Sequence, residues 1–313
     1  MRTFFVAYVL IFKMFLNGVR YSLILILFFF SFSIWATELE PLSKTNTKIN
    51  IQSFCESQLG LYKSYFKNGS IKLAAAKNTG PLPLLSDLCK KALTLEGCTS
   101  VNGAPIFHID EPGKNKKAKN ILVFSLIHGD ETDAGVLGRY WIERLEKVDP
   151  RNNWRIIPIL NPDGVAQKTR TNSKGIDLNR NFPTLDWDEK ALLFWKSQAF
   201  GSERKFPGRS AGSEPEVKCA LQHINNFKPD FVISIHTPLR VLDFDGPKVK
   251  PPIYSYLPWK RLGNFPGSLG RFLWVEKNIP VLTAELKENL PPTASVFEQL
   301  QDLIGQLVQK DLQ

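Results

Sequence analysis

The chain has 313 residues, of which 43% are hydrophobic and 22% are charged, so its composition is that of an ordinary globular protein and excludes disorder as the default state. Its formal net charge is +10 and its pI is about 9.3, which suits an anionic partner. No run of Lys and Arg with interleaved aromatic residues dominates, so we expect no nucleic-acid partner.

Residues 1–36 are apolar and basic, with Arg2, Lys13 and Arg20 but no acidic residue. The run "YSLILILFFFSFSIWA" at their end has the length of a secretory h-region and is short for a membrane span. Ile34 stands where a cleavage site prefers a small residue, so an N-terminal membrane anchor is the alternative to a signal peptide. Either alternative predicts export, with the rest of the chain in the periplasm or anchored facing it, and membrane contact only through this segment.

Residues 37–102 form the next predicted part, a linker followed by a small helical segment. Residues 37–50 are polar, and residues 51–95 show helical spacing that is broken at "NTGPLP". Three roles of this helical segment stay open: a pro-segment, a segment that binds the cell wall, and a structural wrap that packs around the rest of the chain.

All four cysteines lie beyond the N-terminal segment. Export would place them in a compartment that permits disulfides, and their spacing matches no zinc-ribbon pattern. We expect one disulfide among Cys55, Cys89 and Cys98, with the pairing open, and we expect Cys219 to be a plain buried cysteine.

From residue 103 the chain alternates apolar strands with segments of helical spacing, and "NPDG" predicts a turn. Helices are predicted for "DAGVLGRYWIERLEKV", "SEPEVKCALQHINNF" and "PTASVFEQLQDLIGQLVQK". The second of these helices is predicted to have Ser213 as its N-cap and Pro215 in its first turn. Residues 103–313 therefore predict an α/β domain with a mixed, mainly parallel central sheet and helices on both faces. Its strands are expected at "APIFHID", "ILVFSLI", "WRIIPIL", "DFVISIHT" and "PVLTAEL".

Polar residues that can carry chemistry follow three of these strands. His128 and Glu131 flank a strand-to-helix turn, and His236 and Glu285 end two later strands. Because ligands bind at the carboxyl ends of strands in open α/β sheets, we expect these side chains to meet. Two His and one carboxylate are the usual protein ligands of a catalytic zinc ion, and Glu285 is then the candidate general base. Asp130, between the first two, is interpreted as an acid in the first turn of a helix.

The ordered set "HGDE", "NPDG", "GIDLNRNFP", "SIHT" and "LTAEL" resembles the zinc carboxypeptidase family over residues 103–313, which the resemblance identifies as the catalytic domain. It implies one Zn²⁺ per chain and Glu285 as general acid/base. It also implies that Asn179 and Arg180 hold the terminal carboxylate of the substrate, as the bidentate geometry of a guanidinium allows. The implied zinc ligands are His128, Glu131 and His236.

Arg170 is the predicted arginine that stabilises the oxyanion. Pancreatic-type members of the family carry an arginine three positions earlier, where this chain has Gln167, but the loop from there to Asn179 is shorter here. A solvated loop arginine is the alternative for Arg170. No tyrosine is assigned the role of the mobile tyrosine of pancreatic members.

The stretches "SIHTPLRVLDFDGP" and "NFPGSLG" resemble the murein peptide amidase branch, whose members cut the bond between γ-D-glutamate and meso-diaminopimelate in peptidoglycan peptides. The resemblance implies a peptidoglycan-derived peptide substrate, with Arg180 at its carboxylate and Asp243 or Asp245 at an ammonium. A solvated acidic turn is the alternative for these two acids. We expect a monomer. The alternatives for function are a carboxypeptidase for ordinary L-peptides, an amino-acid deacylase of the same fold, and a non-catalytic wall-binding protein.

Overall fold

The computed structural model describes residues 13–16, 19–22, 49–62, 64, 84–287 and 294–310. The chain forms two compact units, Met1–Thr47 and Lys48–Gln313. In the first unit, strands β1 (Lys13–Leu16) and β2 (Val19–Ser22) pair in antiparallel fashion. The rest of the predicted signal or anchor segment, most of the linker and the "NTGPLP" break lie outside the described residues. Within the described part of the chain, no helix has the length and apolar character needed to cross a membrane.

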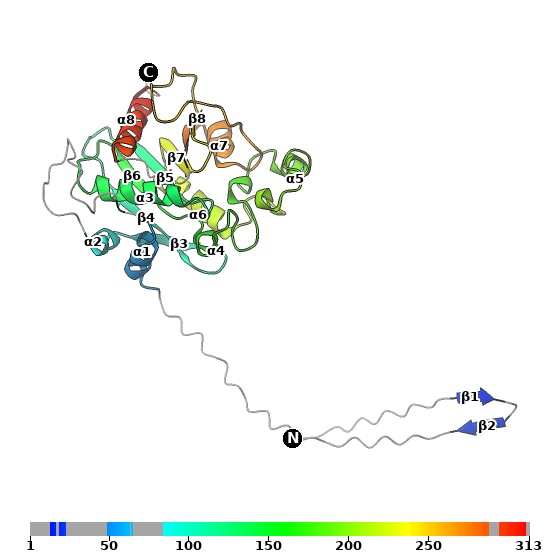
Figure 1. The fold of residues 1–313 in the computed structure, drawn as a ribbon. Helices are drawn as coiled ribbons and strands as arrows, with labels where there is room; N and C mark the ends of the chain where they lie inside the picture. The colour runs from blue at the N-terminus through cyan, green and yellow to red at the C-terminus, as the bar shows by residue number, and fades with distance from the viewer. Residues whose placement is uncertain are drawn as a thin grey trace. The chain divides into compact units, whose positions relative to one another are not determined.

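The second unit is built on a seven-stranded sheet with the order β3-β4-β6-β5-β7-β9-β8 (Figure 1). The four central strands, β6, β5, β7 and β9, run parallel, and β3, β4 and β8 are antiparallel to their neighbours. The carboxyl ends of the four central strands therefore share one edge of the sheet. The strands are β3 (Leu93–Thr99), β4 (Pro105–Glu111), β5 (Asn120–Phe124), β6 (Asn153–Ile157), β7 (Phe231–His236), β8 (Val241–Asp245) and β9 (Val281–Glu285).

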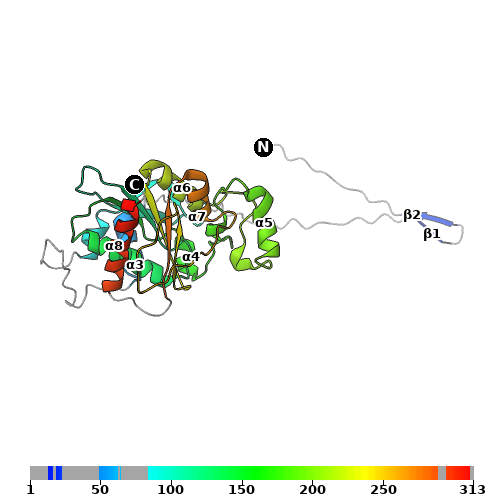
Figure 2. The ribbon, with the colours of Figure 1, turned by 90° about the horizontal axis from the view of Figure 1, so that it is seen from above.

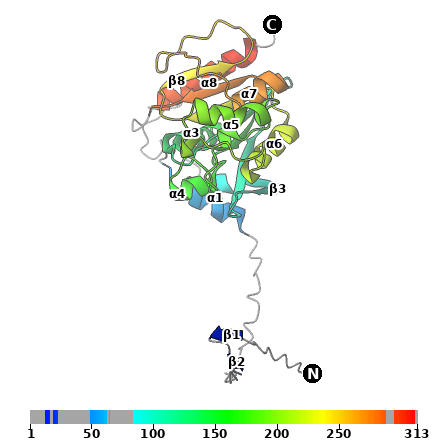
Figure 3. The ribbon, with the colours of Figure 1, turned by 90° about the vertical axis from the view of Figure 1, so that its right-hand side faces the viewer.

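Helices cover both faces of this sheet, because successive strand residues point to opposite faces and both faces are apolar. Ile121 and Val123 of β5 belong to one core with helices α1, α2, α3 and α8, whereas Leu122 and Phe124 belong to a second core with α6, α7 and η3. Figure 2 shows α3 and α8 on one side and α6 and α7 on the other, and Figure 3 shows α5 in front of the sheet. The predicted fold class is confirmed. The helical segments are α1 (Ile51–Leu59), α2 (Leu85–Cys89), α3 (Thr132–Leu145), α4 (Pro162–Gln167), α5 (Trp187–Ser197), α6 (Pro215–Phe227), α7 (Leu269–Arg271), α8 (Ala294–Lys310), η1 (Leu178–Arg180), η2 (Glu203–Lys205) and the π-helical η3 (Phe272–Glu276).

The predicted helical segment is only partly helical. The last residues with helical spacing, 93–95, begin the edge strand β3 (Leu93–Thr99), in which Leu93 pairs with His108 of β4. This strand precedes the predicted domain boundary at residue 103 but belongs to the same sheet as the strands after it. The helical prediction failed here because edge pairing with β4 outweighs a weak local pattern.

Two disulfides involve this N-terminal part, one within it and one that ties it to the rest of the unit. Cys55–Cys89 joins α1 to α2, which confirms the expectation of one disulfide among the first three cysteines. Cys98–Cys219 joins β3 to α6, so the prediction that Cys219 is a plain buried cysteine is wrong. The partners are 121 residues apart and meet only because α6 packs against β3, which no local pattern shows.

Other differences from the sequence-based elements are local. "NPDG" is helix α4 and not a turn, because the Asn161 side chain caps the backbone N–H of Gly164 and Pro162 occupies the first helical position. Helix α6 begins at Pro215 as expected, but its N-cap is Glu214 and not Ser213. Helix α5 and strand β8 were not predicted. Helix α5 was missed because its apolar spacing is weak, with only Trp187 and Ala191 buried.

Candidate metal and catalytic site

The turn after β5 delivers the first two site residues. Gly129 lies against α4, where an added Cβ would come within 2.0 Å of the carbonyl carbon of Gly164, so only glycine fits. His128 precedes this turn, and Glu131 follows it as the N-cap residue of α3. Asp130 therefore lies before the helix and not in its first turn, which corrects the interpretation made from the sequence.

His128, Glu131 and His236, hereafter the metal-donor group, converge although they come from separate segments. Nδ1 of His128 lies 2.7 Å from Oε1 of Glu131, and Nδ1 of His236 lies 2.9 Å from Oε2 of the same carboxylate. The two Nδ1 atoms are 3.2 Å apart. All three residues are buried, and one donor atom of each lies within 4.8 Å of the others, close enough to share one ion.

The outer nitrogen of each imidazole has a hydrogen-bond partner. Nε2 of His128 is 3.2 Å from Oδ1 of Asp177, and Nε2 of His236 is 2.9 Å from Oγ of Ser234. If each Nε2 carries the proton, each Nδ1 directs its lone pair into the group, as a metal ligand must. Arg170 Nη1, a donor, lies 3.2 Å from Nδ1 of His128, which agrees with this tautomer. Two imidazole nitrogens and one carboxylate in this state fit Zn²⁺.

Asp177 is a site residue that the sequence reasoning missed. Besides His128, its fully buried carboxylate accepts hydrogen bonds from Nε of Arg170 at 3.0 Å and from the backbone N–H of Asn179 at 3.0 Å. Burial alone would raise the pKa of Asp177, but the charge of Arg170 and the hydrogen bond with His128 hold that pKa well below its ordinary value. Asp177 stands inside the quoted motif "GIDLNRNFP", and an acid at a helix N-cap position was the available signal.

Arg170 lies against the metal-donor group. Its side chain is 18% exposed, its Nε donates to Asp177, and its Nη1 lies 3.6 Å from Oε1 of Glu131. A solvated loop arginine does not have these contacts, so that alternative is wrong. The position suits a donor to a carbonyl oxygen beside the metal-donor group, and the oxyanion role stays a prediction.

Glu285 is placed beside the metal-donor group by strand register. It ends β9 and lies directly opposite His236 of the neighbouring parallel strand β7. Its side chain is buried, and Oε2 accepts a hydrogen bond from the backbone N–H of Leu239 at 3.3 Å. Glu285 is thus the strand neighbour of His236 without being part of the metal-donor group, a position that suits a general base.

Asn179 and Arg180 follow Asp177 in η1. Oδ1 of Asn179 accepts a hydrogen bond from the backbone N–H of Leu269 at 2.8 Å, and the guanidinium of Arg180 stacks 4.7 Å from the ring centre of Phe265. Nε of Arg180 is buried without a hydrogen-bond partner among the described residues. Burial lowers the pKa of Arg180, which the negative charge of Asp177 partly opposes. A carboxylate ligand would supply the missing acceptor.

Asp243 and Asp245 are residues of β8, so the alternative of a solvated acidic turn is wrong. The antiparallel register pairs them with Thr283 and Val281 of β9, which places both on the same face of the sheet as Glu285. Asp243 is buried and accepts a hydrogen bond from the Leu262 N–H, and its pKa is raised by burial. Burial, reinforced by the charge of Asp243, raises the pKa of Asp245 to about 6. Their contact with a substrate stays a prediction.

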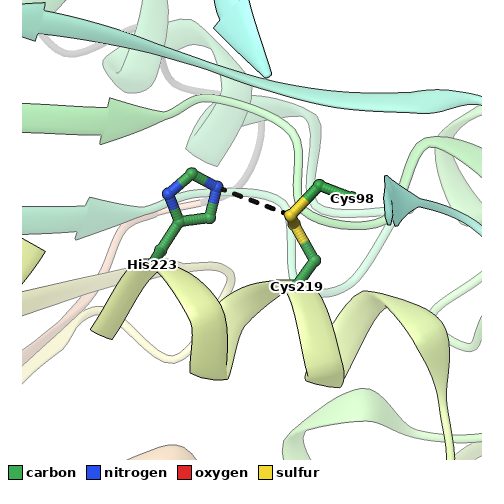
Figure 4. Close-up of side chains that lie close together, drawn as sticks. All are labelled: Cys98, Cys219 and His223. Carbon is green, nitrogen blue, oxygen red and sulfur yellow. Dashed lines mark hydrogen bonds between the residues drawn. A yellow bond between two sulfur atoms is a disulfide. The ribbon is translucent and has the colours of Figure 1, made fainter. Parts of the chain in front are cut away.

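A second set of potential metal donors is closed by a disulfide. Figure 4 shows His223 of α6 with its Nε2 directed at the Cys98–Cys219 bridge, 4.0 Å from the sulfur of Cys98. Thiolates are the species that bind zinc, and both sulfurs are consumed in the bridge. The metal-donor group near β5, β7 and α3 is therefore the candidate metal site.

The sequence and fold match known proteins in a consistent way. Residues 86–245, just over half of the chain, match the zinc carboxypeptidase family. Murein peptide amidase A of Escherichia coli K12 is 33% identical over 148 residues, which cover 46% of this chain and 59% of that enzyme. The Vibrio campbellii protein of the same name is 30% identical over 226 residues, which cover 68% of this chain and 86% of the relative.

Solved structures agree with this result. The murein-tripeptide amidase of Escherichia coli O157 superposes with a TM-score of 0.52 at 25% identity and covers 75% of this chain and 97% of its own. Bovine thrombin-activatable fibrinolysis inhibitor, at 16% identity and a TM-score of 0.54 over 71% of this chain and 90% of its own, shares the fold. The chain therefore belongs to the zinc carboxypeptidase family.

Proposed function

We propose that this chain is a zinc-dependent peptidase that hydrolyses peptidoglycan peptides at the γ-D-glutamyl–meso-diaminopimelate bond. The observation that carries the proposal is the convergence of the metal-donor group with Glu285, which lies opposite His236 in the strand register. A donor set with an adjacent free carboxylate is the arrangement of a hydrolytic zinc site and not of a structural one.

Each residue has a distinct task in this proposal. A zinc ion held by the metal-donor group would polarise a carbonyl and acidify a water molecule. Glu285 takes the proton of the attacking water and passes it to the leaving amine. Arg170 donates to the carbonyl oxygen as it gains charge, and Asp177 holds the guanidinium in place. Arg180, whose Nε lacks a partner among the described residues, takes the carboxylate of the leaving group.

The choice of substrate rests on two supports. The Escherichia coli and Vibrio campbellii relatives named above are murein amidases. Diaminopimelate carries, beyond the α-carboxylate, a second amino acid centre with an ammonium group. Asp243 and Asp245 provide carboxylates on the same sheet face as Glu285. A neutral hydrophobic side chain of an ordinary peptide would offer these two carboxylates no charged partner.

We propose further that the chain acts outside the cytoplasm, in the periplasm or anchored to a membrane and facing it. Two disulfides support an oxidising compartment, and the net charge of +10 suits an anionic wall polymer.

The test compares substrates and metal states. The zinc-loaded chain should release diaminopimelate from L-alanyl-γ-D-glutamyl-meso-diaminopimelate, should lose this activity with a chelator, and should leave ordinary L-peptides uncut. Cleavage of L-peptides with no cleavage of the tripeptide would overturn the substrate assignment and favour the ordinary carboxypeptidase.

The Glu285→Gln variant tests the general base. It should bind zinc with unchanged affinity, because Glu285 lies outside the metal-donor group, and should lose about 10²–10⁴-fold of turnover. Zinc content by metal analysis and kcat by diaminopimelate release are the measurements. Wild-type turnover in this variant would remove Glu285 from the mechanism.

A further inference from the structure

A cavity opens beside Arg170. Its volume is about 480 Å³, and its wall includes Arg170, Trp195, Arg204 and Phe206. The rings of Trp195 and Phe206 lie 5.0 Å apart, and Trp195 is fixed by a hydrogen bond from its indole N–H to the carbonyl of Ser202. The cavity thus combines an aromatic wall with a guanidinium that also contacts the metal-donor group.

The second arginine of this cavity is tied to the turn that carries the metal-donor group. Nη2 of Arg204 donates to Oδ2 of Asp130 at 2.7 Å, whereas Oδ1 of Asp130 is buried with no hydrogen-bond partner among the described residues. The side chain of Arg204 is 64% exposed, so the ion pair is weak and its remaining N–H groups can reach a ligand. Glu203 is the other charged residue in the wall.

In the proposed binding mode, the cavity lies on the acyl side of the scissile bond. The groups assigned to the leaving amine are Asn179, Arg180 and the β8 carboxylates, and none of them lines this cavity. Arg170, the predicted donor to the scissile carbonyl oxygen, forms part of its wall. A substrate whose carbonyl meets Arg170 and whose leaving group meets Arg180 therefore places its acyl residue in the cavity.

A γ-linked glutamyl residue has a distinctive acyl side. Its α-carboxylate is free and stands four bonds, roughly 5 Å, from the scissile carbonyl carbon, and its α-carbon bears an amide N–H. An α-linked residue has its backbone there and no carboxylate. We propose that Arg204 forms a subsite that reads the γ-linkage by binding the free α-carboxylate, with Asp130 holding the guanidinium at the cavity wall. This proposal rests on the proposed function and identifies the residue that gives the enzyme its preference for a γ-linked substrate.

The test uses two tripeptides that differ in one group. L-alanyl-γ-D-glutamyl-meso-diaminopimelate has the free α-carboxylate, and its isoglutaminyl counterpart has a carboxamide there. The zinc-loaded full chain should prefer the first roughly tenfold to a hundredfold in kcat/KM, the size of a charge-assisted hydrogen bond. Arg204→Gln should lower kcat/KM on the first by that factor and leave the second unchanged, and Arg204→Lys should restore part of the preference.

Lys205→Gln is the matched control, because it removes the same charge one position along, outside the cavity wall, and should keep the wild-type preference. If Arg204→Gln lowers kcat/KM equally for both tripeptides, its effect is structural, and the proposed subsite is contradicted. Equal wild-type cleavage of both tripeptides overturns the subsite and leaves the proposed function standing. If the wild type cuts neither, both proposals fail.

Discussion

At the residue scale, the imidazole of His128 is oriented by a carboxylate that does not belong to the metal-donor group. Asp177 accepts from Nε2 of His128 and from Nε of Arg170, so one buried side chain orients both a predicted metal ligand and the predicted oxyanion donor. Such outer partners fix the tautomer of a ligating imidazole and raise its basicity. Asp177 is thus a positioning residue.

Asp177→Asn should weaken zinc binding about 10- to 100-fold, because the amide keeps the shape of the side chain but loses its charge. Competition with a chromophoric chelator measures this affinity without turnover. Asp186→Asn is the control, since Asp186 pairs with Arg271 and is not part of the contacts described for the metal-donor group. Wild-type zinc affinity in Asp177→Asn would show that the carboxylate does not support His128.

The raised pKa of Asp245 predicts a pH-dependent substrate preference. With a pKa of about 6, Asp245 is a carboxylate above that pH and becomes neutral as the pH falls through it. The kcat/KM ratio between the diaminopimelate tripeptide and an analogue without the distal amino group should therefore fall below about pH 6. Taking the ratio cancels ionisations that affect both substrates. Asp245→Asn should weaken this pH dependence, and a constant wild-type ratio from about pH 5 to 8 would contradict the assignment.

At the scale of elements, the N-terminal helical segment holds α3, the helix that Glu131 caps. The ring of Tyr62 lies so close to Gly135 that an added Cβ would be 2.4 Å from its Cε1. Arg139 of α3 donates to the backbone carbonyls of Leu59 and Tyr62 at 2.8 and 2.7 Å. These contacts favour a structural wrap over a detachable pro-segment.

Gly135→Ala should destabilise the unit by about 1–3 kcal/mol, since the methyl group has to displace Tyr62. It should also weaken zinc binding, because Gly135 lies one helical turn from Glu131. Urea unfolding and chelator competition measure the two effects. Gly305→Ala in α8 is the control: its Cβ would meet no atom within 4 Å, so it should raise stability by about 0.5–1 kcal/mol. Equal effects of the two substitutions would contradict the packing argument.

At the scale of the whole molecule, the second unit contains a buried histidine pair that links pH to stability. The rings of His108 on β4 and His223 on α6 meet 4.8 Å apart, next to the Cys98–Cys219 bridge. Burial lowers the pKa of His108 to about 4, with Arg155 contributing, and burial together with His108 lowers the pKa of His223 to about 3. Both rings are therefore neutral in the folded protein at neutral pH.

The unfolded chain binds more protons than the folded one between about pH 6.5 and 4, because unfolded histidines titrate near pH 6.5. Stability should fall as the pH drops through this window, by about 3 kcal/mol for His108 alone. Urea unfolding between pH 7 and 4 measures the loss. His223→Leu should reduce the slope of stability against pH, whatever its effect at pH 7. A slope equal to that of the wild type would exclude the pair as its source.

Much of the site could be predicted from the sequence because catalytic chemistry restricts residue types. The metal-donor group, the carboxylate Glu285 and the motif around Arg180 are each visible as polar residues at strand ends or in an ordered motif. The central strands were equally visible, because a strand buried on both faces must be a continuous apolar run. Local side-chain chemistry and burial therefore determined the sheet and the type of site.

Only the tertiary structure decided how distant segments meet. It paired Cys98 with Cys219, placed Asp177 behind His128, and joined Arg204 to Asp130 across 74 residues of sequence. It also made "VLDFD" a strand in which Asp243 is buried and Asp245 partly buried, where the sequence allowed a solvated turn. These outcomes depend on packing between segments that are far apart in the chain. The free energy of this packing is a sum over contacts throughout the core, so no single stretch of sequence determines it.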